Sequence, residues 1–317
     1  MLDFPHQLKK NEIPPLAIAL GYFDGVHLGH QKVILEAKRS ALEKGLKSAV
    51  MTFDPHPSVV LKKTNEPIHY ITPLKDKIRI IEDLGIDYIF VVHFTEEFSN
   101  LLPQEFVDQY IIGLHVKHVV AGFDYSYGRM GKGTMETLPF HSRGEFTSHI
   151  VPKLVNGNDK VSSTLIRNRL NEGNMAELKA LMGKNYTTIG TVVHGDKRGR
   201  TIGFPTANVD LDDDYIIPPL GVYAVRMKLN GEWINGVCNV GYKPTFNKEA
   251  TIKPSVEIHL LDFDGDIYGR EVEIEWIQYL RKEQKFSSID ELVKQIQKDK
   301  QNVLQYFQQN RQNTLRI

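Results

Sequence analysis

Residues 15–45, PLAIALGYFDGVHLGHQKVILEAKRSALEKG, join a strand pattern, a tight turn and a helix pattern in direct succession. The apolar run at 15–20 is typical of a buried strand. The segment from 27 to 45 repeats apolar residues at helical spacing, and Gly45 is placed to end that helix. The apolar residues of this helix face are Val33, Ile34, Ala37 and Ala41. The pattern predicts a strand–helix unit whose connecting turn lies at the carboxyl end of the strand.

The same alternation continues through the first half of the chain. Further strands are predicted at 47–53, 87–94 and 115–122, and further helices at 73–85, 102–113 and 162–173. Apolar strands that alternate with helices predict an α/β domain built on a doubly wound parallel sheet. In such sheets ligands bind outside the carboxyl ends of the strands.

After about residue 184 the pattern changes to alternating apolar and polar residues. The turn pairs Asn230-Gly231 and Asp264-Gly265 interrupt it, and we expect each to form a hairpin turn. This is the pattern of an antiparallel barrel or sandwich, closed by one helix over 288–309. We therefore expect two domains, 1–183 and 184–317, the second being an antiparallel β-barrel with a C-terminal helix.

The composition limits the class of protein. Lysine plus arginine and aspartate plus glutamate each total 39, so the formal net charge is zero. That argues against a nucleic-acid binder that relies on bulk positive charge, but it permits a small phosphate-rich ligand. Cys238 is the only cysteine, which fits a reducing compartment. We expect no signal peptide and no membrane span, and hence a cytoplasmic protein without a membrane or nucleic-acid partner.

Two histidines, His27 and His30, lie where the first helix is predicted to begin. A helix N-terminus offers unpaired N–H groups and a positive dipole end, so the pair could bind the phosphates of a nucleotide. A zinc ion would need a third and a fourth ligand, and no cysteine lies nearby. From this motif alone, a solvated helix start, a phosphate site and a metal site all stay open.

Three further segments bring polar residues to the same predicted edge of the sheet. TFDPHP (52–57) follows the second strand, AGFDYSYG (121–128) follows the fourth, and SSTLIR (162–167) opens the last helix of this half. Each segment alone has an ordinary interpretation, as a proline turn, an aromatic loop or a helix cap. Because four such loops meet at one edge, we favour a phosphate-binding site there over chance.

A second group of candidate residues lies in HGDKRGRTIGFPTAN (194–208). Its glycines could admit phosphate close to the backbone, although taken alone they favour a flexible hairpin. No Walker sequence is present, so this is not a P-loop kinase. Thr206 and Asn208 are two apart and face the same side of an extended segment. Their oxygen atoms suit Mg²⁺ held together with a nucleotide.

The first half resembles the nucleotidyltransferase half of the bacterial bifunctional riboflavin kinase/FMN adenylyltransferases, also called FAD synthetases, in GYFDGVHLGH, TFDPHP, GFDYSYG and SSTLIRNRL. The second half resembles their kinase half in GTVVHGDKRGRTIGFPTANV, GVYAV, NVGYKPTF and VEIHLLDFDGDIYG. The resemblance covers nearly the whole chain in the family's motif order. It implies an enzyme that phosphorylates riboflavin with ATP and then adenylylates FMN to give FAD and pyrophosphate.

The resemblance also assigns residues to the two reactions. For adenylyl transfer it implies ATP contacts from Gly21, Phe23, His27, His30, Asp124, Ser163, Thr164 and Arg167, and flavin contacts from His56, Tyr125 and Tyr127. For the kinase it implies ATP contacts from Gly195, Lys197, Gly199, Gly203, Thr206 and Asn208, a Mg²⁺ site at Thr206 and Asn208, Glu257 as general base and Arg281 as a flavin contact. The catalytic residues would be His27, His30 and Arg167 for adenylyl transfer and Glu257 for the kinase.

The implied partners are ATP, riboflavin and FMN, with Mg²⁺ bound to the ATP, FAD as a product and no zinc. Weak self-association is an additional expectation. Two other functions stay open at this stage: an adenylyltransferase with a degenerate barrel, and a non-catalytic flavin carrier. The carrier has no use for two phosphate-binding sites, and an intact Thr206, Asn208 and Glu257 speak against the degenerate barrel.

Overall fold

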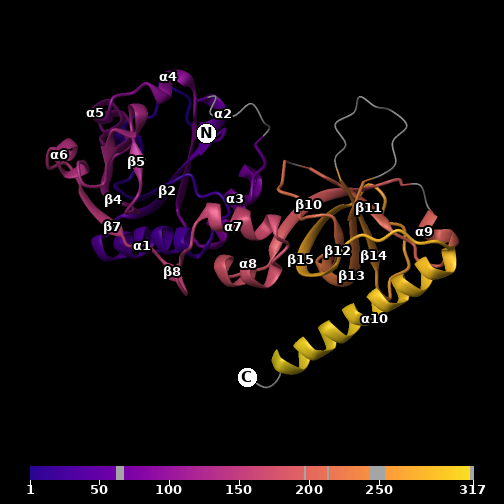
Figure 1. Cartoon of the computed structure of the whole chain (residues 1–317). Coiled ribbons are helices and arrows are strands. Elements are labelled where there is room, and N and C mark those ends of the chain that lie inside the picture. The colour runs from indigo at the N-terminus through magenta and orange to yellow at the C-terminus, as the bar shows by residue number, and fades with distance from the viewer. Residues whose placement is uncertain (62–67, 196–197, 213, 243–253, 315–317) are drawn as a thin grey trace. The chain divides into compact units, whose positions relative to one another are not determined.

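The computed structural model describes residues 1–61, 68–195, 198–212, 214–242 and 254–314 (Figure 1). The chain divides into two compact units, Met1–Leu165 and Ile166–Ile317. Each unit has its own sheet and its own core, as the change of sequence pattern predicts.

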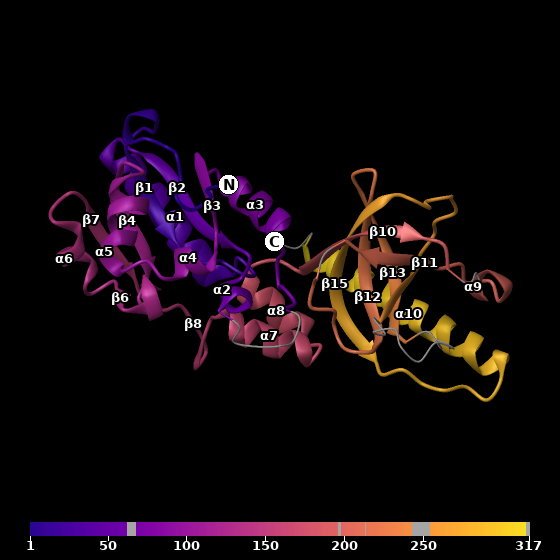
Figure 2. The ribbon, with the colours of Figure 1, turned by 90° about the horizontal axis from the view of Figure 1, so that it is seen from above.

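The first unit is built on a five-stranded parallel sheet in the order β3-β2-β1-β4-β7 (Figure 2). Its strands are β1 (Leu16–Leu20), β2 (Lys47–Asp54), β3 (Tyr88–His93), β4 (Val116–Gly122) and β7 (Thr147–Val151). Ile18 lies opposite Ala49 of β2 and Val119 of β4, so β1 is the central strand. The parallel doubly wound sheet is confirmed.

The helices of this unit cover both faces of the sheet. They are α1 (Leu28–Lys44), α2 (Pro57–Val60), α3 (Leu74–Asp83), α4 (Glu96–Ser99), α5 (Pro103–Phe106) and α6 (Leu138–Ser142), with a π-helical turn at Val107–Ile112 and 3₁₀ turns at Lys10–Glu12 and Arg129–Gly131. Ala19 packs with the buried face of α1, whereas Ile18 and Leu20 pack with α5 and the π-helical turn. Successive residues of a strand point to opposite faces, so β1 contributes to two cores. Gly45 ends α1 in a left-handed conformation (φ 64°), as predicted.

Short paired strands complete the first unit and two helices follow it. The pairs are β5 (Ser126–Tyr127) with β6 (Gly133–Thr134), and β8 (Val155–Asn156) with β9 (Asp159–Lys160). The next helices are α7 (Ser163–Asn171) and α8 (Met175–Met182). α8 buries Met175, Leu178, Leu181 and Met182 and contacts β10 and β15 of the second unit. The compact units therefore divide earlier than the predicted boundary after residue 183, because α8 packs on the barrel.

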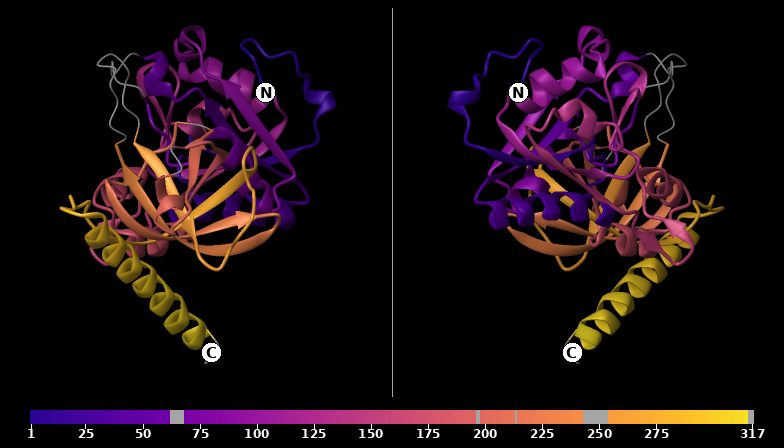
Figure 3. Two further views of the ribbon diagram at one scale, coloured as in Figure 1. Left: turned by 90° about the vertical axis from the view of Figure 1, so that its right-hand side faces the viewer. Right: turned by 90° about the vertical axis from the view of Figure 1, so that its left-hand side faces the viewer.

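The second unit contains a closed six-stranded barrel (Figure 3). Its strand order is β10-β11-β14-β13-β12-β15. Its strands are β10 (Tyr186–Val193), β11 (Ala207–Leu211), β12 (Gly221–Leu229), β13 (Glu232–Gly241), β14 (Ser255–Leu260) and β15 (Glu271–Arg281). All its strand pairs are antiparallel. The predicted barrel is confirmed over the sandwich.

Within the described part of the barrel sequence, after β10 begins, the helices are α9 (Arg198–Thr201) and α10 (Ile289–Thr314). The long α10 runs along the outside of the barrel (Figure 1). Its buried Val303 packs in a cluster with Val222, Ala224 and Val237 of β12 and β13. The predicted C-terminal helix is therefore confirmed, and it is anchored by an apolar face.

The two predicted hairpin turns have different outcomes. Asn230 and Gly231 both have positive φ, 51° and 87°, and they join the paired strands β12 and β13. By contrast, β14 pairs with β11 and β13, whereas β15 pairs with β10 and β12. The hairpin predicted at Asp264-Gly265 is therefore wrong, because an Asp-Gly pair favours a chain reversal without determining which strands pair in a closed barrel.

Candidate functional sites

The loops predicted to meet at one edge of the parallel sheet do follow β1, β2 and β4 at their carboxyl ends. The loop after β1 is strained, since Phe23 and Val26 have positive φ, 59° and 37°, without being glycine. A Cβ at Gly21 would lie 2.7 Å from the Phe23 ring, so only glycine fits there. Phe23 itself is buried, and its ring meets His30 edge-on at 5.3 Å between centroids. Gly21 and Phe23 therefore help to position His30.

His27 and His30 form a stacked pair at the start of α1. Their ring centroids are 3.6 Å apart, with 17° between the planes. His27 caps the helix, because its Nδ1 accepts a hydrogen bond of 3.2 Å from the backbone N–H of His30. The neutral His27 ring therefore carries its hydrogen on Nε2. Among the described residues, nothing bonds the buried Nδ1 of His30.

Burial makes both imidazoles neutral near pH 7. His27 is only 4 % exposed, and this burial lowers its pKa from 6.5 to about 4. The pKa of His30 is lowered well below 6.5, first by burial, with further contributions from the nearby His27 ring and from the positive charges of Lys77 and Lys160. The pair can thus donate or accept hydrogen bonds, but it brings no positive charge of its own to a phosphate.

This neutrality predicts an acid-labile first unit. Between pH 6.5 and 4, His27 becomes protonated in the unfolded chain but stays neutral in the folded chain. The free energy of unfolding therefore falls as the pH falls. The fall due to His27 amounts to roughly 3 kcal/mol. Urea unfolding across this range should show a shallower fall for His27→Gln than for the wild type. His149→Gln, at an exposed histidine, is the control and should keep the wild-type slope, whereas equal slopes for all three proteins would contradict a neutral His27.

The start of α7 is tied to the loop after β1. Ser162 caps the helix by accepting the N–H of Leu165 at 3.3 Å, and the Ser163 hydroxyl donates to the Asp24 carbonyl at 2.9 Å. Thr164 is exposed, and Arg167 follows it by one helical turn. Ser163 therefore already has a backbone acceptor in this conformation, and Thr164 presents its hydroxyl to solvent.

The other residues proposed for this edge also have partners. Asp124 forms an ion pair with Lys160, whose ammonium lies 4.6 Å above the Phe123 ring. His56 caps α2 by accepting the N–H of Ser58 at 3.0 Å, and its ring meets Tyr22 edge-on. Lys160 is close enough to lower the pKa of His27, yet sequence analysis missed it because a lone lysine in a hairpin carries no motif.

The two tyrosines after β4 differ in their surroundings. Tyr127 is 4 % exposed, packs against Phe106 and makes a 2.7 Å hydrogen bond between its hydroxyl and Nδ1 of His141. Its ring is part of the core, so we no longer assign Tyr127 to the flavin. Tyr125 stacks on it at 6.3 Å and is only partly buried, which leaves Tyr125 as the candidate.

A second site lies on the outer face of the barrel. Glu257 of β14 pairs with Asn208 of β11 on one side and with Asn239 of β13 on the other. Val256 and Ile258 are buried, so Glu257 faces away from the barrel interior and is partly exposed. Three polar side chains on adjacent strands thus share one face. Asn239 was missed because only strand register reveals it.

The glycine-rich segment packs directly on this polar face. A Cβ at Gly195 would lie 2.1 Å from the Asn208 amide nitrogen, and a Cβ at Gly199 would lie 2.3 Å from the Phe204 carbonyl. Gly203 is needed for its positive φ of 84° and not for close approach. Two of the three glycines therefore bring backbone against the Thr206–Asn208 segment. Lys197 lies outside the described residues.

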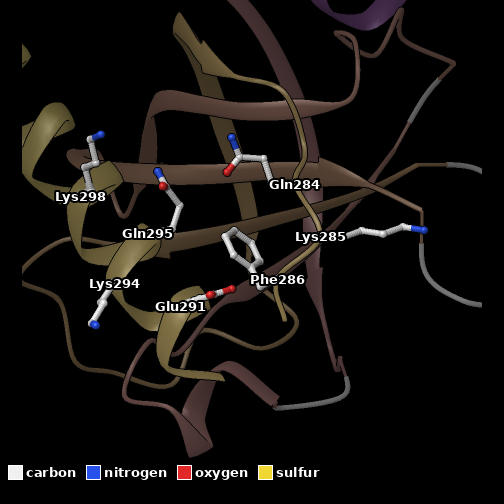
Figure 4. A pocket seen from close by; sticks show the side chains of 7 residues that line it. All are labelled: Gln284, Lys285, Phe286, Glu291, Lys294, Gln295 and Lys298. Atoms are coloured by element: carbon white, nitrogen blue, oxygen red, sulfur yellow. The ribbon is translucent and has the colours of Figure 1, made fainter. Parts of the chain in front are cut away.

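A groove of about 610 Å³ opens between the segment after β15 and the first turns of α10 (Figure 4). Phe286 provides an aromatic face, and Lys285, Lys294 and Lys298 make the lining basic. The remaining lining residues are Gln284, Glu291 and Gln295. Glu283, directly before the groove, lies so close to Gly241 that a Cβ there would meet its carboxylate. The groove therefore begins beside β13, next to the face that carries Glu257.

Arg281, the proposed flavin contact, is engaged elsewhere. Its Nε lies 3.0 Å from both carboxylate oxygens of Asp299 on α10, and its Nη1 donates to the Lys282 carbonyl. Asp299 is buried, so this pair fastens α10 to β15. Arg281 is therefore held by Asp299 in this conformation, a pairing that the sequence alone could not show.

The free thiol of Cys238 is buried within β13. Burial, followed by the nearby Glu257 charge, raises the pKa of this thiol far above its usual value. A thiol held protonated is a poor nucleophile, so Cys238 acts as an inert core residue.

The side chains and helices of the chain bear on metal binding and membrane insertion. Within the residues that the structure describes, no three His, Cys, Asp or Glu side chains come together to hold a metal ion. No helix in that same part of the chain is long and apolar enough to cross a membrane.

Comparison with known proteins gives matches over nearly the whole chain. A family model described as FAD synthetase matches residues 9–165, and one described as riboflavin kinase matches residues 182–307. A Bacillus subtilis protein named bifunctional riboflavin kinase/FMN adenylyltransferase is 54% identical over 306 residues, covering 96% of this chain and 97% of its own. A Listeria monocytogenes protein of the same name is 52% identical over 290 residues, covering 92% of each chain.

Among solved structures, one from Streptococcus pneumoniae named as a macrolide-efflux protein is similar throughout. It has a TM-score of 0.84 and 34% sequence identity, and the match covers 95% of this chain and 98% of the other. The likeness therefore includes both the parallel sheet and the barrel.

Proposed function

Because the chain belongs to the family of bifunctional riboflavin kinases/FMN adenylyltransferases, we propose that its two reactions are divided between the two sites described above. The enzyme phosphorylates riboflavin to FMN and adenylylates FMN to FAD. The barrel face around Glu257 carries out the first reaction, and the edge of the parallel sheet around His27 and His30 carries out the second.

In adenylyl transfer an oxygen of the FMN phosphate attacks the α-phosphorus of ATP, and the bond to pyrophosphate breaks. This chemistry requires alignment and hydrogen-bond donors, and no nucleophile from the protein. The stacked histidines at the N-terminus of α1 are the observation that supports the assignment. The Nε2–H of His27 and the first backbone N–H groups of α1 would bind the phosphates. Ser163, Thr164 and Arg167 at the start of α7 would hold the departing pyrophosphate.

In the kinase reaction the 5′-hydroxyl of riboflavin attacks the γ-phosphorus of ATP and loses its proton. Glu257 would accept that proton, since it is a partly exposed carboxylate beside Asn208 and Asn239. The register that places Asn208 next to Glu257 is the observation that carries this assignment. The groove at Phe286 would receive the flavin ring, because it combines an aromatic face with a position beside this polar face.

The donor set beside Glu257 fits Mg²⁺. Thr206 and Asn208 provide oxygen atoms, and the backbone at Gly195 and Gly199 approaches closely enough to bind the phosphates of the same nucleotide. The ion would neutralise charge on the ATP phosphates. Chromatography of flavins after incubation with riboflavin and ATP tests the proposal: FMN and FAD should form with Mg²⁺, and neither should form with EDTA. If the wild-type enzyme forms FMN and FAD equally well in the presence of EDTA, the proposed magnesium site is wrong.

We keep the domains 1–183 and 184–317 as a proposal. The riboflavin kinase match begins at 182, and SSTLIR at the start of α7 belongs chemically with the first site. α8 then connects the two domains while it packs on the barrel. A cytoplasmic location, weak self-association, the absence of zinc and the absence of nucleic-acid and membrane partners also stay proposals. ATP as the shared substrate supports the location.

A further inference from the structure

A lysine of α3 places its ammonium group beneath the loop that precedes the two histidines. Lys77 is only 2 % exposed. Its Nζ donates to the Tyr22 carbonyl at 3.0 Å and lies 4.1 Å from the centre of the Tyr22 ring. The Thr52 hydroxyl donates to the same carbonyl at 2.8 Å. A single backbone oxygen in the strained loop after β1 is thus held from α3 and from β2.

The titratable side chains around this ammonium come from three other elements. Asp24 in the loop after β1 and Asp54 at the end of β2 favour the charged form of Lys77, and His30 of α1 feels its positive charge. Burial outweighs the two carboxylates and lowers the pKa of Lys77 from 10.5 to about 8. At neutral pH the amine is therefore charged, whereas His27 and His30 are neutral.

A buried cation is costly unless the structure uses it. At this edge of the sheet the expected ligand is a triphosphate, and hydrogen bonds from neutral imidazoles do not balance its charge. A fixed charge in a water-poor site acts strongly on a bound anion, because little solvent screens it. Burial also prevents Lys77 from touching the nucleotide directly in this conformation.

We propose that Lys77 is a positioning residue for adenylyl transfer, which holds the loop carrying His27 and His30 through the Tyr22 carbonyl and offsets the negative charge of Asp24 and Asp54 where the nucleotide phosphates would bind. The proposal rests on the assignment of His27 and His30 to ATP. A purely structural lysine would instead satisfy the Tyr22 carbonyl, and its loss would lower stability without altering how the rate depends on pH.

The test measures kcat/KM for ATP in FAD synthesis from supplied FMN, from pH 6 to 10. In the wild type it should fall about tenfold per pH unit above pH 8, because the charged form of Lys77 is the active one and kcat/KM reports the free enzyme. Lys77→Met should lie about 10²-fold lower at pH 7, the size expected when one preorganised electrostatic contact is lost, and should lack the alkaline fall. Lys75→Met, at an exposed lysine of the same helix, should match the wild type.

Lys77→Arg separates charge from structure and decides the matter if Lys77→Met fails to fold. It should stay within about tenfold of the wild type at pH 7 and lose the alkaline fall, because arginine stays charged throughout this range. A Lys77→Arg enzyme as impaired as Lys77→Met, or variants that keep the wild-type alkaline fall, would overturn the proposal. Riboflavin phosphorylation by the same proteins should be unchanged. Failure here leaves the result for His27 and His30 intact, so the two assignments can be distinguished.

Discussion

Replacement of both His27 and His30 by alanine should leave an enzyme that converts riboflavin to FMN and stops there. The two imidazoles stack at the N-terminus of α1, and loss of one preorganised donor typically costs about 10² to 10³ in rate. Loss of both, together with the cap on α1, should abolish detectable FAD synthesis. The barrel has its own core and its own polar face around Glu257, so FMN should still accumulate.

Chromatographic separation of riboflavin, FMN and FAD over time measures both steps in one reaction. His149→Ala is a suitable control, since it removes an exposed imidazole from β7 of the same unit. It should leave both rates unchanged. If the double variant makes FAD at the wild-type rate, the histidines do not bind the nucleotide, and the first site must be reassigned.

Glu257→Gln is expected to lower the rate of riboflavin phosphorylation by about 10² to 10⁴, which corresponds to roughly 3 to 5 kcal/mol of activation free energy. Glutamine keeps the shape of the side chain and its place opposite Asn208 and Asn239, but it cannot accept the proton of the riboflavin hydroxyl. The KM values for riboflavin and ATP should change little, because a general base acts mainly in the transition state.

The same variant provides its own internal comparison. Adenylylation of supplied FMN should be unchanged, since Glu257 belongs to the barrel. Glu232→Gln, at an exposed position of β13, should leave both reactions at wild-type rates. A simple solvent-facing glutamate at 257 would predict near-normal kinase activity and a stability change within about 0.5 kcal/mol. A kinase rate within a few-fold of the wild type would remove Glu257 from the mechanism.

Local periodicity was sufficient to predict both folds. The apolar runs of β1 and β2 and the buried face of α1 have short-range signals, and the alternation of strands with helices implies parallel pairing. The wrong hairpin at Asp264-Gly265 shows the limit of this reasoning. Which strands pair is a property of the closed barrel, and the residues between β14 and β15 carry no mark of it.

The candidate sites were only partly predictable, because burial and the choice of partners depend on the folded structure. Parallel pairing places the loops after β1, β2 and β4 at one edge of the sheet. It was therefore possible to predict from the sequence that His27 and His30 lie near the other loops. Ionisation depends on burial, which sequence does not reveal: the histidines become neutral and Lys77 becomes a buried cation. Competition for partners was equally hidden, as Arg281 shows by pairing with Asp299.

The central claim is that one chain uses two separate sites and two ATP molecules to turn riboflavin into FAD. The most direct test incubates the wild-type enzyme with riboflavin and Mg²⁺ in parallel reactions, with ATP labelled with ³²P at either the γ or the α phosphate. Label from the γ position should appear first in FMN and then in FAD, because that phosphate becomes the flavin phosphate. Label from the α position should enter FAD alone, as part of the AMP group. Appearance of α label in FMN, or FAD that carries α label without γ label, would contradict the account.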